Sequence, residues 1–270
     1  MCTQLTWLRG LLAIQLLSFW PVWKWYVLRM TDGADEPWGV LPLITCVVFC
    51  RQFNPGRDAD RVNLLIPTLL TVLYAVSYAF APKLMLAAIA VIGCGSLICR
   101  LRFGTYCHAA FFGLLLLSLP VMASLQFYLG YPLRVVSGGI ASGLLRMSGL
   151  SVVLEGTSLR WGADLVAIDA PCSGVRMLWA GVYLALAAAF HLRLSTFRTA
   201  SAAALSVGAV LMGNGIRSAA LFHMETGLIA LPQWYHAAIG LIAFAGTALV
   251  IVWAVTRMAG GLQWVSASSS

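Results

Sequence analysis

Apolar runs follow one another along this chain with only short polar connections, and this pattern constrains the fold more than any other feature. A helix needs about 20 apolar residues, within a range of roughly 17–25, to cross the hydrocarbon core of a bilayer. Apolar side chains make up 61% of the residues and charged ones 10%, which is typical of polytopic membrane proteins. The lipid bilayer is therefore the expected surroundings of the chain.

Seven of the runs are long enough to span, and they lie at about residues 5–23, 62–80, 82–99, 106–129, 173–190, 199–222 and 237–256. The shorter run 38–50 is either a span that uses flanking residues or a re-entrant segment. Counting it as a span, we predict an all-α polytopic membrane protein with about eight transmembrane helices. Residues 1–270 are expected to form a single integral-membrane domain.

The basic residues predict the orientation. The formal net charge is +8, but the Lys and Arg residues stand singly between apolar runs and form no cluster, so we expect no nucleic-acid partner. Under the positive-inside rule the N-terminus is cytoplasmic, because the short outer loops then hold only Lys24, Arg29 and Lys83. Both termini are then expected on the cytoplasmic side of the membrane.

The first apolar run and the cysteines argue against a cleaved signal peptide, a disulfide framework and a metal site. Arg9 precedes an apolar stretch, as in a signal peptide, but residues 20–25 after it contain no small-residue cleavage site, so an uncleaved span is predicted. The seven cysteines form no CxxC pair and no Cys/His cluster with metal-ligand spacing. We expect neither a disulfide framework nor a metal, and no cofactor.

An extended region without spans runs from about 130 to 171. Leu133 to Leu150 reads as a helix lying on the outer surface. The runs 151–155 and 165–169 are β-leaning, and glycines break the sequence between them. We predict a small extracytoplasmic β-hairpin before the sixth span; the alternative is a plain connecting loop.

Three reactive side chains meet at the outer face in this topology. Cys172 opens the sixth span, Arg217 lies near the outer end of the seventh, and His236 begins the eighth. A helix N-terminus favours the thiolate. A thiolate nucleophile, a proton-transfer imidazole and a guanidinium that stabilises an oxyanion are what cysteine acyl transfer requires.

Each of these residues also has a structural interpretation. Cysteines in membrane helices are commonly packing residues. Arg217 could extend to the interface, although an arginine within a span indicates function by default. His236 follows Trp234 and Tyr235 and could belong to an interfacial aromatic belt. His223 is a rival imidazole at the same face.

At these residues the chain resembles the exosortase/archaeosortase family of membrane-embedded cysteine transpeptidases. The matching motifs are Cys172-Ser173-Gly174 opening a span, Asn214-Gly215-Ile216-Arg217 late in the next span, and His236 starting the one after. The resemblance is specific over about 170–240. It departs from the family pattern near the N-terminus, where Pro37-Trp38-Gly39 replaces the usual Ser-His-Gly.

The resemblance implies an enzyme without a metal that cleaves C-terminal sorting signals of the PEP-CTERM kind from exported proteins. Cys172 would form an acyl-enzyme, His236 would transfer protons, and Arg217 would bind the oxyanion. Asn214, Arg176 and Ser173 would support them, and the catalytic portion would cover about 130–256. The substrates would be exported proteins with a C-terminal sorting helix, processed at the extracytoplasmic face of a bacterial inner membrane.

Two functions of other classes stay open. A polytopic transporter would place Arg217, Glu225 and His236 along a polar pathway, since ionisable groups within membranes mark such paths. A membrane acyltransferase that is not a protease would use the same Cys172 and His236 but would need a site for an acyl donor.

Overall fold

The computed structural model describes residues 2–31, 37–51, 65–168, 173–229, 232 and 234–267. These residues divide into two compact units. Unit 1 comprises residues 1–121 with 193–199, and unit 2 comprises residues 122–192 with 200–270. The predicted site residues all belong to unit 2.

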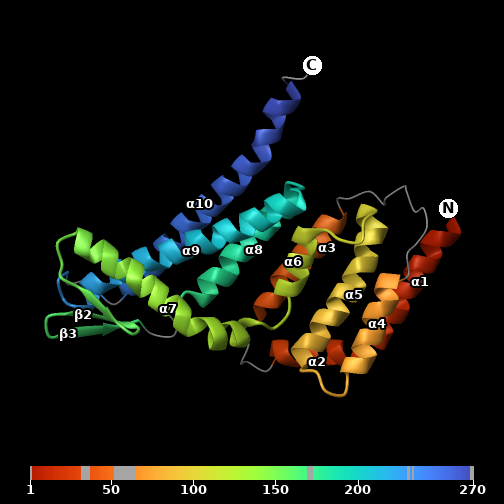
Figure 1. Ribbon diagram of the computed structural model, residues 1–270, viewed down its shortest axis with the longest axis horizontal. Helices are drawn as coiled ribbons and strands as arrows, with labels where there is room; N and C mark the ends of the chain where they lie inside the picture. The colour runs from red at the N-terminus through yellow and green to blue at the C-terminus, as the bar shows by residue number, and fades with distance from the viewer. Residues whose placement is uncertain are drawn as a thin grey trace. The chain divides into compact units, whose positions relative to one another are not determined.

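Unit 1 is helical. Its elements are α1 (Cys2–Ser18), α2 (Trp20–Thr31), the 3-10 turn η1 (Pro37–Gly39), α3 (Val40–Arg51), α4 (Leu65–Ser77), α5 (Lys83–Phe103) and α6 (Ala109–Leu117). Helix α5 contacts α1, α2, α4 and α6, and Figure 1 shows α4 and α5 side by side. Its middle is lined by small residues such as Ala87 and Ala90, which are fully buried and let neighbouring helices approach closely.

Unit 2 combines helices with a small sheet. Its elements are α7 (Met122–Met147), β1 (Val153–Glu155), β2 (Ser158–Trp161), β3 (Asp164–Ala167), α8 (Val175–His191), most of α9 (Thr196–Glu225) and α10 (Trp234–Ala267). Helix α8 packs against α7 and α10, and α7 also contacts β1 and β2 (Figure 1).

Two of the predicted spans are interrupted, and proline explains both breaks. Helices α1 and α2 meet at Phe19 with a bend of 61°. Pro21 has no N–H to donate to the preceding turn, so it is accommodated in the first turn of a new helix. Helix α6 ends at Leu117 and α7 begins at Met122, and Pro120 lies in the break. The expected span 106–129 is therefore not one continuous helix.

The surface helix expected over Leu133 to Leu150 is not a separate element. Residues 133–147 belong to α7, which begins at Met122 and runs for 26 residues, and residues 148–150 follow its end. Pro132 lies inside this helix without ending it. The prediction placed the start of this helix too late, because residues 122–129 continue the apolar run 106–129 and were assigned to the preceding span.

Eight spans are not confirmed. By length and composition, three described helices could each cross a membrane, or up to five spans if each interrupted pair counts as one. Helices α3, α4 and α8 are apolar but shorter, at 12, 13 and 17 residues. The predicted multi-pass membrane protein is supported, whereas the number of crossings stays a prediction.

The two predicted strands are present as β1 and β3, but they do not form a hairpin with each other, because an additional strand, β2, lies between them and pairs with both. The antiparallel sheet has the order β1-β2-β3. Gly156 and Gly162 occupy its two turns with φ of 61° and 58°, a conformation that glycine adopts without strain. Arg160 on β2 bonds to Glu155 on β1 at 2.5 Å, and this bond holds the pKa of the exposed Glu155 carboxyl below its usual value.

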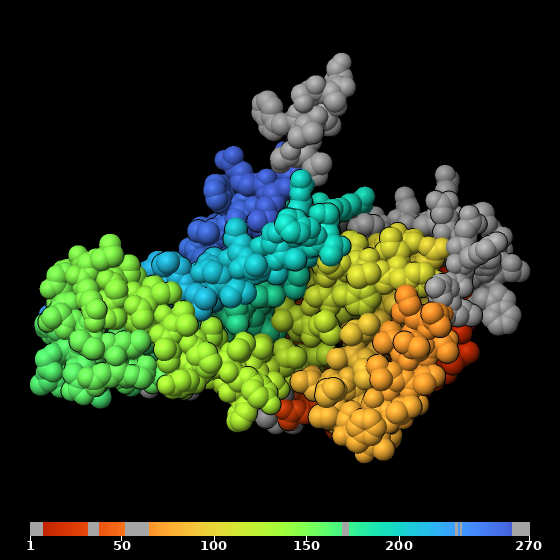
Figure 2. Space-filling view, in the orientation of Figure 1, coloured from red at the N-terminus to blue at the C-terminus, as the bar shows by residue number. Residues whose placement is uncertain are grey.

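The sheet packs on α7 and α9 through one apolar cluster. The buried members are Ala141 and Leu145 of α7, Val152, Leu159 and Ile168 from the sheet region, and Ala219 and Phe222 of α9. Figure 2 shows α7 and the sheet, in yellow-green and green, as one continuous surface. The cluster fixes the sheet against the end of α9 that carries Arg217.

Candidate active site

The segment 169–172, and with it the predicted nucleophile Cys172, lies outside the described residues. The described chain resumes at Ser173, and Gly174 is the N-cap of α8 with φ of 85°. The helix therefore begins at Val175, three positions after Cys172 in the sequence. Gly174 adopts a left-handed backbone conformation, which is strained for residues that carry a β-carbon.

Ser173 is anchored to α7. Its hydroxyl donates to Oε1 of Gln126 at 3.1 Å and accepts from the backbone N–H of Val175 at 3.5 Å. The side chain is 2% exposed. Ser173 thus ties the start of α8 to α7 and fixes the backbone that follows Cys172.

Asn214 joins the first two sequence motifs. It is 1% exposed on α9, and its Nδ2 donates to Oγ of Ser137 on α7 at 2.9 Å. A β-carbon on Gly174 would lie 2.8 Å from the same Nδ2, so only glycine fits beside this amide. Asn214 therefore packs directly against the backbone of Gly174. Gln126 and Ser137, which hold Ser173 and Asn214, lie about three helical turns apart on one face of α7.

Arg217 joins the second motif to the third. It lies one helical turn after Asn214 and is half-buried. A β-carbon on Gly240 of α10 would lie 3.3 Å from Nε of Arg217 and 3.6 Å from one terminal nitrogen. The guanidinium thus lies over Gly240, and His236 is one turn before Gly240 on the same helix face.

A cavity of about 250 Å³ connects His236 with the sheet. Its lining comes from β3 and Ile168, from Ser218, Leu221, Phe222 and Glu225 of α9, and from His236 of α10. It holds an imidazole and a carboxylate, which are the groups that proton transfer uses.

Arg176 and His223 are not part of the lining of this cavity. Arg176 is on the first turn of α8 and is exposed, and it does not line the cavity. His223 lies within α9, which continues to Glu225, three residues beyond the predicted end of this span at about residue 222. His223 stacks edge-on with Phe222 and does not line the cavity, whereas His236 does.

Sequence reasoning missed Gln126, Ser137 and Gly240. Gln126 and Ser137 are polar residues in a predominantly apolar helix, and that contrast could have marked them. Gly240 carried a weaker signal: it lies one turn after a histidine that was already a candidate.

One comparison identifies the family of this chain. The family model described as transmembrane exosortase matches residues 7–253. No curated protein and no solved structure matches the chain significantly. The matched range covers nearly the whole chain and includes every site residue named above. The chain belongs to the transmembrane exosortase family.

Proposed function

We propose that this protein is a membrane-embedded cysteine transpeptidase that cleaves a C-terminal sorting signal of the PEP-CTERM kind from exported proteins. Family membership supports a membrane transpeptidase role in general. The observation that carries the finer proposal is the packing of Arg217 over Gly240, one helical turn from His236. This packing supports the proposal because it puts the Arg217 guanidinium against α10, one helical turn from His236.

The proposed reaction has two steps. The Cys172 thiolate attacks the carbonyl carbon of the scissile peptide bond, and Arg217 stabilises the oxyanion of the tetrahedral intermediate. The C–N bond then breaks, and His236 gives a proton to the leaving amine. The products are a thioester on Cys172 and the released sorting helix. An amine or water, deprotonated by His236, attacks the thioester and regenerates the thiol.

The supporting residues act through position. Asn214 and Ser173 fix the turn between Cys172 and α8 by their bonds to Ser137 and Gln126. Arg176, one helical turn after Cys172 in the sequence, is proposed to stabilise the thiolate by its charge. The catalytic portion is proposed to cover about residues 130–256.

We further propose that the segment ahead of the scissile bond binds as a strand on β3. The backbone N–H of Ile168 donates to the carbonyl of Thr157, and Val166 is paired with Leu159. In an antiparallel pair, every second residue of a strand directs its N–H and C=O groups to its partner strand. The N–H and C=O groups of Leu165 and Ala167 therefore face away from β2. These groups lie at the edge of the described sheet and beside the cavity. An added strand would use them as backbone partners.

The spacing supports this arrangement. Cys172 follows Ala167 by five positions, which an extended chain covers in about 17 Å. A substrate strand on β3 would therefore place its next peptide bonds within reach of the thiol, while His236 faces the same cavity.

The site is proposed to face the extracytoplasmic side, with both termini cytoplasmic. Labelling of intact cells with a membrane-impermeant maleimide tests this. Cys172 should be labelled from outside, while the buried Cys46, Cys50, Cys94 and Cys99 should stay largely unlabelled. Labelling of Cys172 only after the membrane is disrupted would contradict the orientation.

Processing in cells tests the activity. The substrate is an exported protein of the same bacterium that ends in a short motif, an apolar span and a basic cluster. Cys172→Ala and Cys172→Ser should both abolish its cleavage while the enzyme stays inserted and abundant, because a serine hydroxyl is far less acidic than a thiol. Cleavage by Cys172→Ala at the parental rate would refute the proposal.

A further inference from the structure

Two cavities of unit 1 lie far from the chemistry in sequence, and neither is used by the proposed function. The first measures about 420 Å³ and the second about 450 Å³. Both volumes fall in the range of ligand sites, about 300–1,000 Å³. They lie among α1, α2, α3, α5 and α6, and Leu43, Ile98 and Leu115 line both, so the two cavities adjoin.

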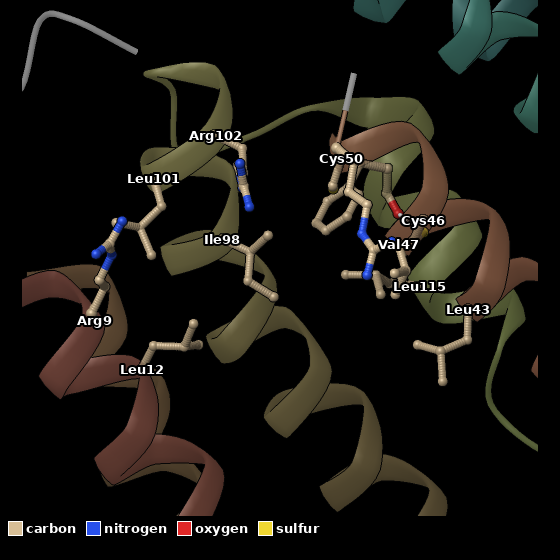
Figure 3. Close-up of a pocket in the computed structure, with 12 residues that line it drawn as sticks. Arg9, Leu12, Leu43, Cys46, Val47, Cys50, Ile98, Leu101, Arg102 and Leu115 are labelled. Atoms are coloured by element: carbon tan, nitrogen blue, oxygen red, sulfur yellow. Dashed lines mark hydrogen bonds between the residues drawn. The ribbon is translucent and has the colours of Figure 1, made fainter. Parts of the chain in front are cut away.

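The first cavity is basic. Arg9 of α1, Arg51 of α3 and Arg102 of α5 line it, and none of its described lining residues is a carboxylate. In Figure 3 the guanidinium groups of Arg9 and Arg102 lie towards one end of the cavity, and the side chains of Leu12 and Leu43 lie towards the other. Three helices therefore contribute positive charge to the lining of this cavity.

The second cavity is almost entirely apolar. Leu16, Leu17, Val91 and Leu119 are among its lining residues. The indole of Trp23 and the hydroxyl of Ser118 also line it, and both already donate to backbone carbonyls. A hydrocarbon chain could fill this space without displacing a hydrogen bond of either group.

The positive-inside rule explains why arginines gather on one side of a membrane. It does not explain why three of them border one cavity, nor why that cavity adjoins an apolar one. Charge at one end and an apolar wall at the other fit a ligand with an anionic head and a hydrocarbon tail. Guanidinium groups bind phosphate oxygens through paired hydrogen bonds, and basic pockets between membrane helices bind anionic head groups.

We propose that these adjoining cavities bind one anionic membrane glycerophospholipid. Its phosphate is held by Arg9, Arg51 and Arg102, and one acyl chain runs past Leu43 and Ile98 into the apolar cavity. This lipid site is independent of the transpeptidase activity proposed above.

Native mass spectrometry of the purified full-length protein tests the proposal. Dioleoyl phosphatidylglycerol and dioleoyl phosphatidylcholine are offered at equal concentration, and the phosphatidylglycerol should bind at least about tenfold more tightly. Arg9→Gln/Arg102→Gln should remove that preference. The matched control, Arg29→Gln/Arg257→Gln, loses the same charge outside the cavities and should keep the preference within about twofold. If the double variant fails to fold, the single variants Arg9→Gln and Arg102→Gln are compared with Arg29→Gln.

A second arm separates a lipid from a free anion. Inorganic phosphate and the short-chain dihexanoyl phosphatidylglycerol are used as competitors of the dioleoyl lipid. The short-chain lipid should compete at least about tenfold more weakly than unlabelled dioleoyl lipid, and inorganic phosphate more weakly still. Equal binding of phosphatidylcholine, an equal loss in the control variant, or displacement by phosphate alone at similar concentration would each overturn the proposal.

Discussion

The backbone of Gly174 lies directly against the side chain of Asn214, since a β-carbon on Gly174 would come within 2.8 Å of the Asn214 amide nitrogen. Two motifs that are distant in the sequence meet at this contact. The amide is held from the other side by Ser137, at 2.9 Å. The start of α8 is thus defined by three elements at once, which is how a site keeps a nucleophile in one position.

Gly174→Ala should remove processing and destabilise the protein. A non-glycine residue at this φ costs about 1–2 kcal/mol, and the added carbon collides with a buried, hydrogen-bonded amide. The measurement is substrate cleavage together with the thermal unfolding midpoint in detergent. Gly208→Ala on α9 is the control: its β-carbon meets open space and alanine favours helix, so both readouts should stay at the parental level. A fully active Gly174→Ala would show that the contact is dispensable.

Arg217→Lys should lower the rate of cleavage by about 10²–10³. Lysine keeps the charge but lacks the planar fork of donors. A role that needs only charge, as in a conduction path, would tolerate the change. The rate is measured on membranes with equal amounts of enzyme. If activity stays within a few-fold of the parent, the oxyanion assignment is wrong.

Gly240→Ala should move the Arg217 guanidinium, because the new carbon would sit 3.3 Å from Nε. Small displacements of a catalytic group are costly, and we expect a loss of about tenfold in kcat with little change in KM. Gly246→Ala lies on the same helix with nothing within 4 Å and is the matched control. Equal activities of the two variants would contradict the positioning role of Gly240.

His236→Ala should abolish nearly all cleavage, and His223→Ala should leave most of it. His236 lines the cavity beside β3, whereas His223 does not. The comparison is made by cleavage in cells at matched expression. A dead His223→Ala beside an active His236→Ala would reverse the assignment.

Ala167→Pro should impair cleavage without unfolding the sheet. Its N–H faces away from β2, and proline is tolerated where the N–H of an edge strand is not paired within the sheet. We expect kcat/KM to fall by at least about tenfold. Ala167→Ser keeps the N–H and should stay near the parental value. If the proline variant processes substrate normally, the substrate does not pair with this edge.

The sequence predicted the two outer strands of the sheet, whereas the catalytic roles of the site residues stay predictions. Arg217 and His236 could be named because they stand at the outer ends of apolar runs, Asn214 because of the family resemblance, and the turn glycines marked the strands. The breaks at Phe19 and Pro120 were missed because the apolar runs continue across them; the missing N–H of a proline interrupts a helix without changing hydropathy. The partners Gln126 and Ser137 depend on the rotation of α7, which sequence pattern alone did not provide.

The most direct test of the account is the covalent intermediate on Cys172. Purified enzyme is mixed with a substrate whose acceptor nucleophile is withheld, quenched in acid and digested for mass spectrometry. The account predicts a substrate fragment joined to Cys172 as a thioester, which hydroxylamine removes and which Cys172→Ala lacks. Rapid cleavage without any adduct, or an adduct on another residue, would contradict it.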